Sequence, residues 1–304
     1  MKHLNFFLII LSVAIASFKI EAAPDAGQTG TKSYDARGVV RQIAPDRRKV
    51  TIQHEAIAGF MPAMTMEFNV KDTNELIGIS PSDEITFKLV VGENDSWVEG
   101  IHFVAHRVEN VTNNTFTFHF RSFELKPGDL LPDCEFMSEN GGKIHFSDFR
   151  GKALAFTFFY SRCPLPDYCQ RMNKYFSEAR KLLMTTPDAP SNWQLLSISF
   201  DPGFDNSEML SSYASIYRGE DTNRWLFVAA TTNALAHLAP QLDLMIMRDG
   251  NNIVSHNLRT VVLDPHGRIF RQLDGNQWTP QELADAIQQA ARGQTNSAPD
   301  STAF

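Results

Sequence analysis

The sequence predicts two domains, a small all-β domain followed by an α/β domain. Five short strand-like runs with turns between them occupy residues 36–112, whereas strand-like and helix-like runs alternate over residues 125–292. A Pro-Gly turn at Pro127-Gly128 lies near the boundary. The 304 residues suffice for about two domains, and 43% hydrophobic with 21% charged residues are typical of a globular chain.

Residues 1–23 have the composition of an export signal. A short positive start precedes an apolar run over residues 4–18, and Ala22-Ala23 offers a plausible cleavage neighbourhood. We therefore expect an exported protein in an oxidising compartment, either periplasmic or held on the outer face of the inner membrane. In the second case the uncleaved segment would be an N-terminal membrane anchor, although the run is short for a span.

The first domain is expected to be a small β-barrel. Residues 24–35 are small and polar, as in a linker, and residues 113–124 are expected to connect the two domains. The strand-like runs between them cover residues 38–43, 49–53, 64–70, 84–91 and 97–108. Five short strands with turn signals predict a barrel.

Two methionines stand out in the third of these runs. Met64 and Met66 alternate along the strand, so both side chains lie on the same face, and His54 is close by in the sequence. Phe68 and Val70 continue that face, which fits methionines that simply fill a core. The alternative is a soft site of two thioethers and one imidazole, suited to Cu(I) or Ag(I).

Residues 36–110 resemble the periplasmic copper- and silver-binding CusF-like family. The resemblance depends on His54, the run Pro62-Ala63-Met64-Thr65-Met66 and Phe68. It implies a five-stranded OB-like barrel with His54, Met64 and Met66 as metal ligands. The efflux-pump chaperone of that family has a Trp before the proline as a cation–π cap on the metal. Met61 holds that place here, so it is either a fourth soft ligand or a sign that the cap is missing.

Cys163 and Cys169 lie where a predicted buried strand, residues 153–160, gives way to a predicted helix, residues 167–184. Two prolines between the cysteines hold the loop out of helical conformation. Unpaired N–H groups at the start of a helix stabilise a thiolate, which attacks disulfides and binds soft metals. A structural disulfide is the alternative, and the third cysteine, Cys134, is expected to be a small buried hydrophobe.

The remaining elements also alternate between strand and helix. The predicted strands cover residues 193–200 and 225–229, the helices cover 205–217, 232–238 and 279–292, and a hairpin joins 254–263 to 268–273. This order predicts a thioredoxin-like α/β fold. Residues 293–304 are expected to be a disordered tail.

Residues 125–292 resemble the Sco/SenC family of copper-delivery proteins. The resembling pieces are residues 149–152, 158–169, 197–202, Asp205, Tyr213, and His256 before residues 262–267. The resemblance implies that Cys163 and Cys169 are thiolate ligands and His256 an imidazole ligand of Cu(I) or Cu(II). Asp201 would tune a ligand by a hydrogen bond, or simply cap its loop. Five residues separate the cysteines here, where the family usually has three.

Two soft-metal motifs in separate domains together predict an exported copper chaperone. The first domain would capture Cu(I), and the second would deliver it to a cytochrome oxidase subunit or another copper-accepting protein. Two alternatives stay open, namely copper sequestration for resistance and a thiol-disulfide oxidoreductase that uses Cys163 and Cys169 with a thiol reductant protein as partner. A net charge of −7 provides no electrostatic case for nucleic acid.

Overall fold

The computed structural model describes residues 30–107, 124–219, 221–249 and 252–294. The expected export signal (1–23), residues 113–123 of the expected connector and residues 295–304 of the expected tail lie outside these ranges. Within the described ranges, no helix combines the length and apolar character that a membrane span requires.

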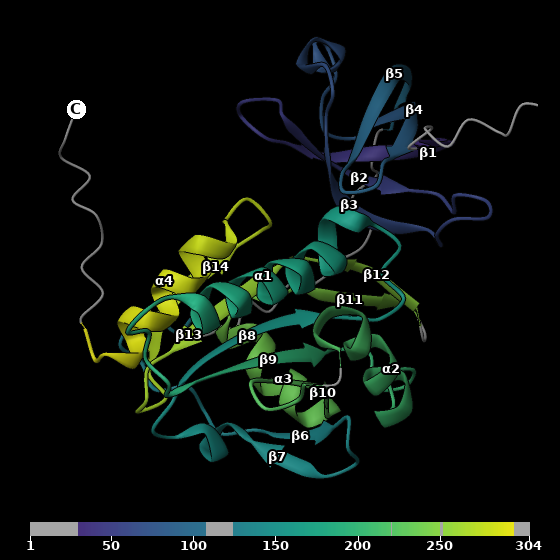
Figure 1. Cartoon of the computed structure of the whole chain (residues 1–304). Coiled ribbons are helices and arrows are strands. Elements are labelled where there is room, and N and C mark those ends of the chain that lie inside the picture. The colour runs from purple at the N-terminus through teal and green to yellow at the C-terminus, as the bar shows by residue number, and fades with distance from the viewer. Residues whose placement is uncertain (1–29, 108–123, 220, 250–251, 295–304) are drawn as a thin grey trace, which may run out of the picture.

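The first domain, called the β-domain below, is a five-stranded antiparallel sheet at the top of Figure 1. Its elements are β1 (Lys32–Ile43), β2 (Lys49–His54), β3 (Met64–Asn69), the short 3-10 turn η1 (Thr73–Leu76), β4 (Asp83–Val91) and β5 (Ser96–His106). The strand order is β3-β2-β1-β4-β5, and one parallel bridge joins Val70 to Val98 on β5. The all-β prediction is confirmed, whereas closure of the sheet into an OB-like barrel stays a prediction.

β1 begins at Lys32, inside the stretch 24–35 that was expected to be a linker. Residues 32–35 pair with residues 88–91 of β4, so the backbone ladder continues beyond the apolar part of the strand. The side chains of these four residues are polar or only half-buried, and they therefore show no apolar alternation that could reveal a strand.

The second domain, called the α/β domain, contains a seven-stranded sheet of order β14-β13-β8-β9-β10-β6-β7. The strands are β6 (Glu135–Ser138), β7 (Lys143–His145), β8 (Ala153–Phe159), β9 (Trp193–Ser199), β10 (Trp225–Ala230), β13 (Arg259–Leu263) and β14 (Ile269–Asp274). β8, β9 and β10 run parallel at the centre, and every residue of β8 and β9 is buried. Such continuous burial requires cover on both faces of the sheet.

Helices connect and cover these strands (Figure 1). They are the 3-10 turn η2 (Phe146–Phe149), the π-type turn η3 (Pro166–Gln170), α1 (Arg171–Thr185), α2 (Ser207–Arg218), α3 (Thr232–Gln241) and α4 (Pro280–Ala291). α1 packs against α4, while α2 and α3 pack against β10. Asn206 caps α2, and Thr279 caps α4 with a proline at its first position.

Two predicted elements differ in the structure. The stretch 254–263 is not one strand, because β12 (Asn252–His256) pairs with β11 (Ile246–Asp249) in a separate two-stranded sheet. β13 lies instead between β8 and β14, while β12 lies against β3 of the β-domain. The predicted helix 167–184 begins with the irregular turn η3, since Tyr168 adopts the non-helical angles φ −104° and ψ −119°. In both cases distant partners decide the local conformation.

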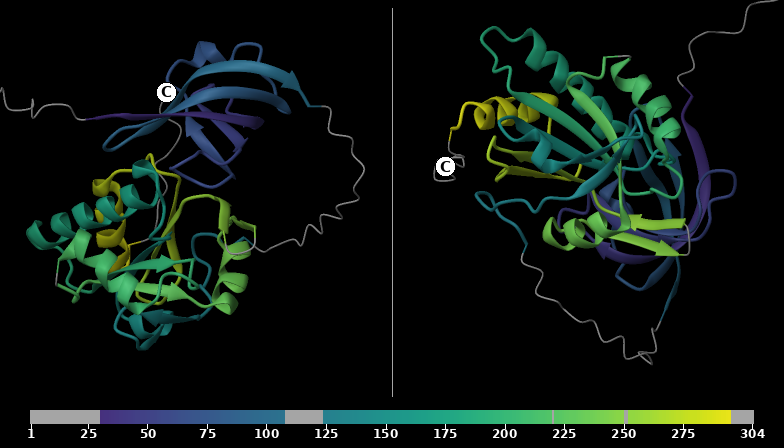
Figure 2. Two further views of the ribbon diagram at one scale, coloured as in Figure 1. Left: turned by 90° about the vertical axis from the view of Figure 1, so that its right-hand side faces the viewer. Right: turned by 90° about the horizontal axis from the view of Figure 1, so that it is seen from below.

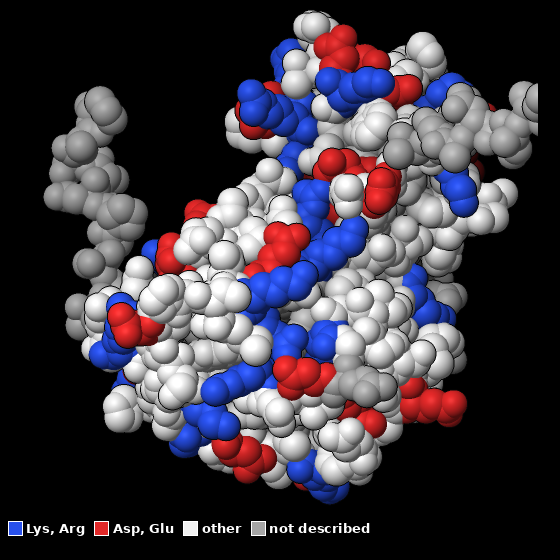
Figure 3. Space-filling view, in the orientation of Figure 1, with Lys and Arg blue, Asp and Glu red and all other residues white. Residues whose placement is uncertain are grey.

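The β-domain lies directly on the α/β domain, where β3 contacts β12, and the left view of Figure 2 shows the purple and blue strands of the β-domain above the α/β domain. In Figure 3 lysine and arginine side chains form a band that crosses from one domain to the other, with acidic side chains beside it. Two residues of α1 form contacts with the β-domain. Arg171 pairs with Asp95, and Lys174 donates a hydrogen bond to the Asn94 side chain over 2.9 Å.

Candidate metal centres

The α/β domain brings together the three residues that the sequence analysis selected there. One ligand atom each from Cys163, Cys169 and His256 lies within 4.8 Å of the other two. Cys163 lies in the loop after β8, Cys169 in the turn η3, and His256 at the end of β12. All three are buried, so water competes little with a bound ion.

Two buried carboxylates hold the loop that carries Cys163. Asp205 accepts hydrogen bonds from the Ser161 backbone N–H over 3.0 Å, from the Ser161 hydroxyl and from the Ser199 hydroxyl. Asp201 pairs with Arg162, the residue before Cys163, over 2.6 Å. Asp201 therefore orients the loop beside the ligand, which is the kind of supporting contact that metal sites need.

The two thiols differ in their proton affinity. Burial would raise the pKa of Cys163, but hydrogen bonds from Cys169 and His256 and the charge of His256 together hold that pKa well below its usual range. Burial and the hydrogen bond to Cys163 raise the pKa of Cys169 well above its usual range. Within the coupled pair, the surroundings therefore favour ionisation of Cys163 over ionisation of Cys169.

His256 is oriented by the backbone and by three aromatic rings. Its Nδ1 lies 3.1 Å from the carbonyl oxygen of Asn257, so an Nδ1–H that donates there leaves Nε2 to hydrogen-bond Cys163 as an N–H, or to offer its lone pair to a metal ion once that proton is lost. The rings of Tyr160, Tyr168 and Phe200 lie with their centroids 5.5, 5.8 and 5.2 Å from the imidazole. This packing restricts the rotation of the imidazole.

None of these three aromatic residues was predicted from the sequence to belong to the site. Tyr160 and Phe200 directly follow the parallel strands β8 and β9, and side chains at the carboxyl ends of parallel strands share one edge of a sheet. That signal was available for Tyr160 and Phe200. Tyr168 offered none, because its position depends on the irregular turn η3.

The β-domain brings a second set of predicted residues to its interior. His54 on β2 pairs with Met64 on β3, and Ile52 pairs with Met66, so the side chains of His54, Met64 and Met66 lie on the inner face. Met61 is also buried, in the turn that Ile57 closes by pairing with it. The ligand roles of these residues stay predictions, and their burial alone would equally suit a core.

His54 has one feature that a core histidine seldom has. Its Nδ1 lies 2.7 Å from the carbonyl oxygen of Glu55, while its buried Nε2 has no hydrogen-bond partner. Burial lowers the pKa of the imidazole, so the ring is neutral and Nε2 carries a lone pair. A buried nitrogen lone pair and two buried thioethers on the same face of the sheet are a donor set that fits a soft monovalent cation.

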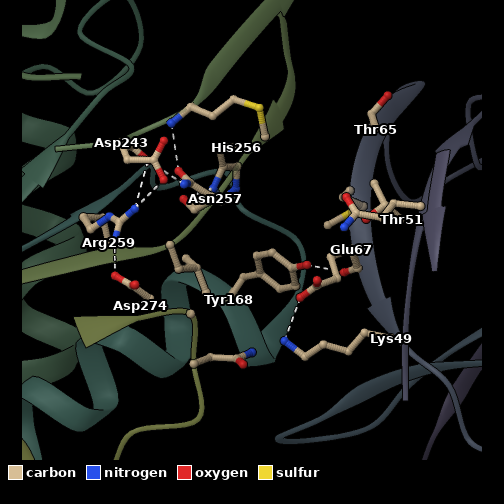
Figure 4. Close-up of a pocket in the computed structure, with 16 residues that line it drawn as sticks. Lys49, Thr51, Thr65, Glu67, Tyr168, Asp243, His256, Asn257, Arg259 and Asp274 are labelled. Carbon is tan, nitrogen blue, oxygen red and sulfur yellow. Dashed lines mark hydrogen bonds and ion pairs between the residues drawn. The ribbon is translucent and has the colours of Figure 1, made fainter. Parts of the chain in front are cut away.

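A cavity of about 560 Å³ lies between the two domains. Figure 4 shows Glu67 and Lys49 of the β-domain on one side, His256 and Asn257 on the other, and the ring of Tyr168 projecting between them. Met66 also lines this cavity. Arg259 pairs with Asp243 over 2.8 Å and with Asp274, which ties the surrounding loops together.

Comparison with known families divides the chain at the same place as the structure. The model of the family "Copper binding periplasmic protein CusF" matches residues 33–102, and the model of the SCO1/SenC family matches residues 124–292. The second match covers more than half of the 304 residues. A comparison with curated proteins found no match.

Three solved structures are similar to the α/β part of the chain. A putative electron transfer protein from Aquifex aeolicus has 24% identity and a TM-score of 0.48, and the match covers 58% of this chain and 99% of that one. The copper-bound ScoI of Arabidopsis thaliana has 14% identity and a TM-score of 0.47, with coverages of 54% and 99%. A SCO1/SenC family lipoprotein from Bacillus anthracis has 19% identity and a TM-score of 0.48, with coverages of 55% and 99%.

Proposed function

This chain belongs to the SCO1/SenC family, and on that premise we propose that it is an exported copper chaperone that binds Cu(I) and Cu(II) and delivers copper to another protein. The observation that carries this proposal is the convergence of Cys163, Cys169 and His256 within 4.8 Å. Two thiolates and an imidazole suit copper, and three protein ligands leave a coordination position through which an acceptor can take the ion. Asp201 supports the site by holding Arg162.

The β-domain would capture the ion first. Its similarity to the copper-binding CusF family and the unpartnered Nε2 of His54 support a Cu(I) site with Met64 and Met66. Met61 is buried nearby in sequence and would add a fourth soft ligand. The same thioether set would accept Ag(I), because silver is also a soft monovalent cation.

The recipient we propose is a cytochrome c oxidase subunit with a copper centre, as the family membership suggests. The composition of residues 1–23 supports export, and the site would then work in the periplasm or at the outer face of the inner membrane. In that oxidising compartment, conversion of Cys163 and Cys169 to a disulfide would abolish copper binding, so a thiol reductant protein would be required for loading.

A second candidate function is favoured by the unequal thiols. A thiolate at Cys163 beside a protonated Cys169 is the arrangement of an attacking thiol and a resolving thiol in a thiol-disulfide oxidoreductase. In this case the protein would reduce disulfides of exported proteins. Loss of His256 would then slow the reductase, because its hydrogen bond and charge lower the pKa of Cys163, but it would leave both thiols in place, whereas the copper function requires that imidazole as a ligand.

The stoichiometry of Cu(I) on the reduced protein under anaerobic conditions tests the first proposal. We expect two bound ions, of which Cys163→Ser/Cys169→Ser and His256→Ala each remove the one in the α/β domain. Met64→Leu/Met66→Leu should remove the other. One ion that only the methionine variant abolishes would contradict copper binding in the α/β domain, and reduction of a mixed disulfide substrate would then test the oxidoreductase.

A further inference from the structure

We propose that the five residues between Cys163 and Cys169 form a docking element that holds the β-domain over the thiolate site, so that each chain transfers Cu(I) from its own β-domain to its own cysteines. This inference rests on the proposed function and assigns the route of transfer. It starts from the position of Asp167 and Tyr168, which belong to the inter-cysteine segment and contact the β-domain.

Asp167 anchors the segment to the β-domain by buried contacts. Its carboxylate accepts hydrogen bonds from the Ser96 hydroxyl over 2.6 Å and from the Asn69 amide over 3.2 Å. Asp167 is only 1% exposed, and Ser96 is 3% exposed. A buried carboxylate without such donors is costly, so these contacts stabilise the docked arrangement over one in which the domains separate.

Tyr168 bridges the two strands that carry ligands of the candidate metal centres. Its hydroxyl donates to the backbone oxygen of Glu67, the residue after Met66 on β3. Its ring packs edge-on against the His256 imidazole at 5.8 Å between centroids. Figure 4 shows this ring reaching from the cysteine loop across the cavity to Glu67. A single side chain between the two cysteines therefore touches both ligand-bearing strands.

The strands that carry the two ligand sets also lie against one another. β3 carries Met64 and Met66, β12 ends at His256, and the two strands are in contact. Met66 and His256 line the same cavity of about 560 Å³. The donor strand and the acceptor strand thus border the same cavity, and this cavity is the route that we propose for the ion.

The chemistry favours movement from the β-domain to the cysteines. Thiolates bind Cu(I) more strongly than thioethers do, so exchange of thioether ligands for thiolates runs downhill. Copper keeps its oxidation state: the bonds from His54 Nε2 and the methionine sulfurs break, and bonds from the two cysteine sulfurs and His256 form. The protons on the Cys169 sulfur and on His256 Nε2 leave to water as these atoms bind the ion.

The docked β-domain also shields this site from copper carried by other chains, which provides the test. The donor chain is Cys163→Ser/Cys169→Ser, loaded with Cu(I) in its β-domain, and the acceptor chain is metal-free, reduced Met64→Leu/Met66→Leu. Mixing them and following the ultraviolet charge-transfer absorption of thiolate-bound Cu(I) measures transfer between chains. Adding Ser96→Ala/Asn69→Ala to both chains removes the donors to Asp167, and we expect transfer between chains to become about tenfold faster.

Lys88→Ala in both chains is the matched control. It removes the exposed pair of Lys88 with Asp35, which lies within the β-domain, and should leave the transfer rate unchanged. Amide hydrogen exchange of β3 reports undocking itself. Asn94→Ala/Asp95→Ala, which removes side-chain partners of Lys174 and Arg171, is a second undocking variant should Ser96→Ala impair folding.

An unchanged or slower transfer between chains in variants whose β3 exchanges faster would overturn the proposal. So would unchanged exchange of β3 in both undocking variants, because docking would then not depend on these contacts. Failure of the proposed function would appear earlier and separately, as a donor or acceptor chain that binds no Cu(I) before mixing.

Discussion

Replacement of His54 by leucine should distinguish a metal ligand from a core residue. In the metal-free protein His54 Nε2 is buried without a partner, which costs about 1–3 kcal/mol. His54→Leu removes that cost but also the hydrogen bond to Glu55, worth about 0.5–1.5 kcal/mol. We therefore expect the metal-free β-domain of the variant to be as stable as wild type or up to about 2 kcal/mol more stable.

Bound Cu(I) should make the wild-type β-domain more stable than the His54→Leu variant. A site saturated at about one hundred times its dissociation constant gains about 2.7 kcal/mol of stability. Wild type should show this gain, and His54→Leu should show almost none because Nε2 is lost. Amide hydrogen exchange of β2 and β3 in the full chain measures both quantities, since exchange through local opening reports the stability of the segment.

The pH dependence provides an internal check on His54. The unfolded chain takes up a proton on this residue near pH 6.5, whereas burial lowers the pKa of the folded imidazole. Between these two pKa values the unfolded state binds more protons, so the stability of wild type falls as the pH decreases below 6.5. His54→Leu lacks this contribution and should depend less on pH in that range.

His102→Leu is the matched control, because His102 is an exposed imidazole on β5 of the same domain. This substitution should change the free energy of unfolding by less than about 0.5 kcal/mol, and it should leave copper binding unchanged. The reasoning would be refuted if His54→Leu destabilised the metal-free β-domain by more than about 2 kcal/mol while Cu(I) affinity stayed at the wild-type value. That result would make His54 a structural core residue.

Three further predictions concern contacts that stabilise the two domains away from the candidate metal centres. Glu139→Ala leaves Arg218 without its buried partner and should destabilise the protein by about 3–5 kcal/mol in urea unfolding, with copper stoichiometry unchanged. Thr279→Ala removes the cap of α4 and should cost about 0.5–2 kcal/mol in the same measurement. The hydrogen bond from His106 lowers the pKa of Asp83 in the folded protein. The resulting contribution to stability is complete above the unfolded pKa near 3.8 and is lost as the pH falls further. Asp83→Asn should therefore make the free energy of unfolding less dependent on pH in acid.

A matched substitution or a contrary outcome tests each of these three predictions. Asp221→Ala breaks the more exposed pair with Arg180 and should cost less than about 1 kcal/mol. An equal loss of stability for Glu139→Ala and Asp221→Ala would contradict the expectation that the buried pair contributes more. Thr279→Ser keeps a capping hydroxyl and should stay near wild type. If the stability of Asp83→Asn fell with pH in acid as that of wild type does, carboxylates other than Asp83 would cause the acid dependence.

The sequence determined the ligand candidates and the two-domain order. Alternation along 64–70 places Met64 and Met66 on one face, and the structure confirms that placement together with the inward position of His54. The strand–loop–helix pattern places Cys163 and Cys169 together, and the structure adds His256 within 4.8 Å. These features were predictable because they depend on local periodicity or on short motifs.

Tertiary structure alone decided the strand split before β13, the irregular turn η3, and the docking of the two domains. His256 belongs to β12 because that strand pairs with β11 and lies beside β3, although the sequence runs on into β13 without a turn signal. Asp167 meets Ser96 across 71 residues of chain, and Tyr168 meets Glu67 across 101. Contacts between residues so far apart leave no periodic signal in either segment, because each side chain is selected by a partner that only folding brings near.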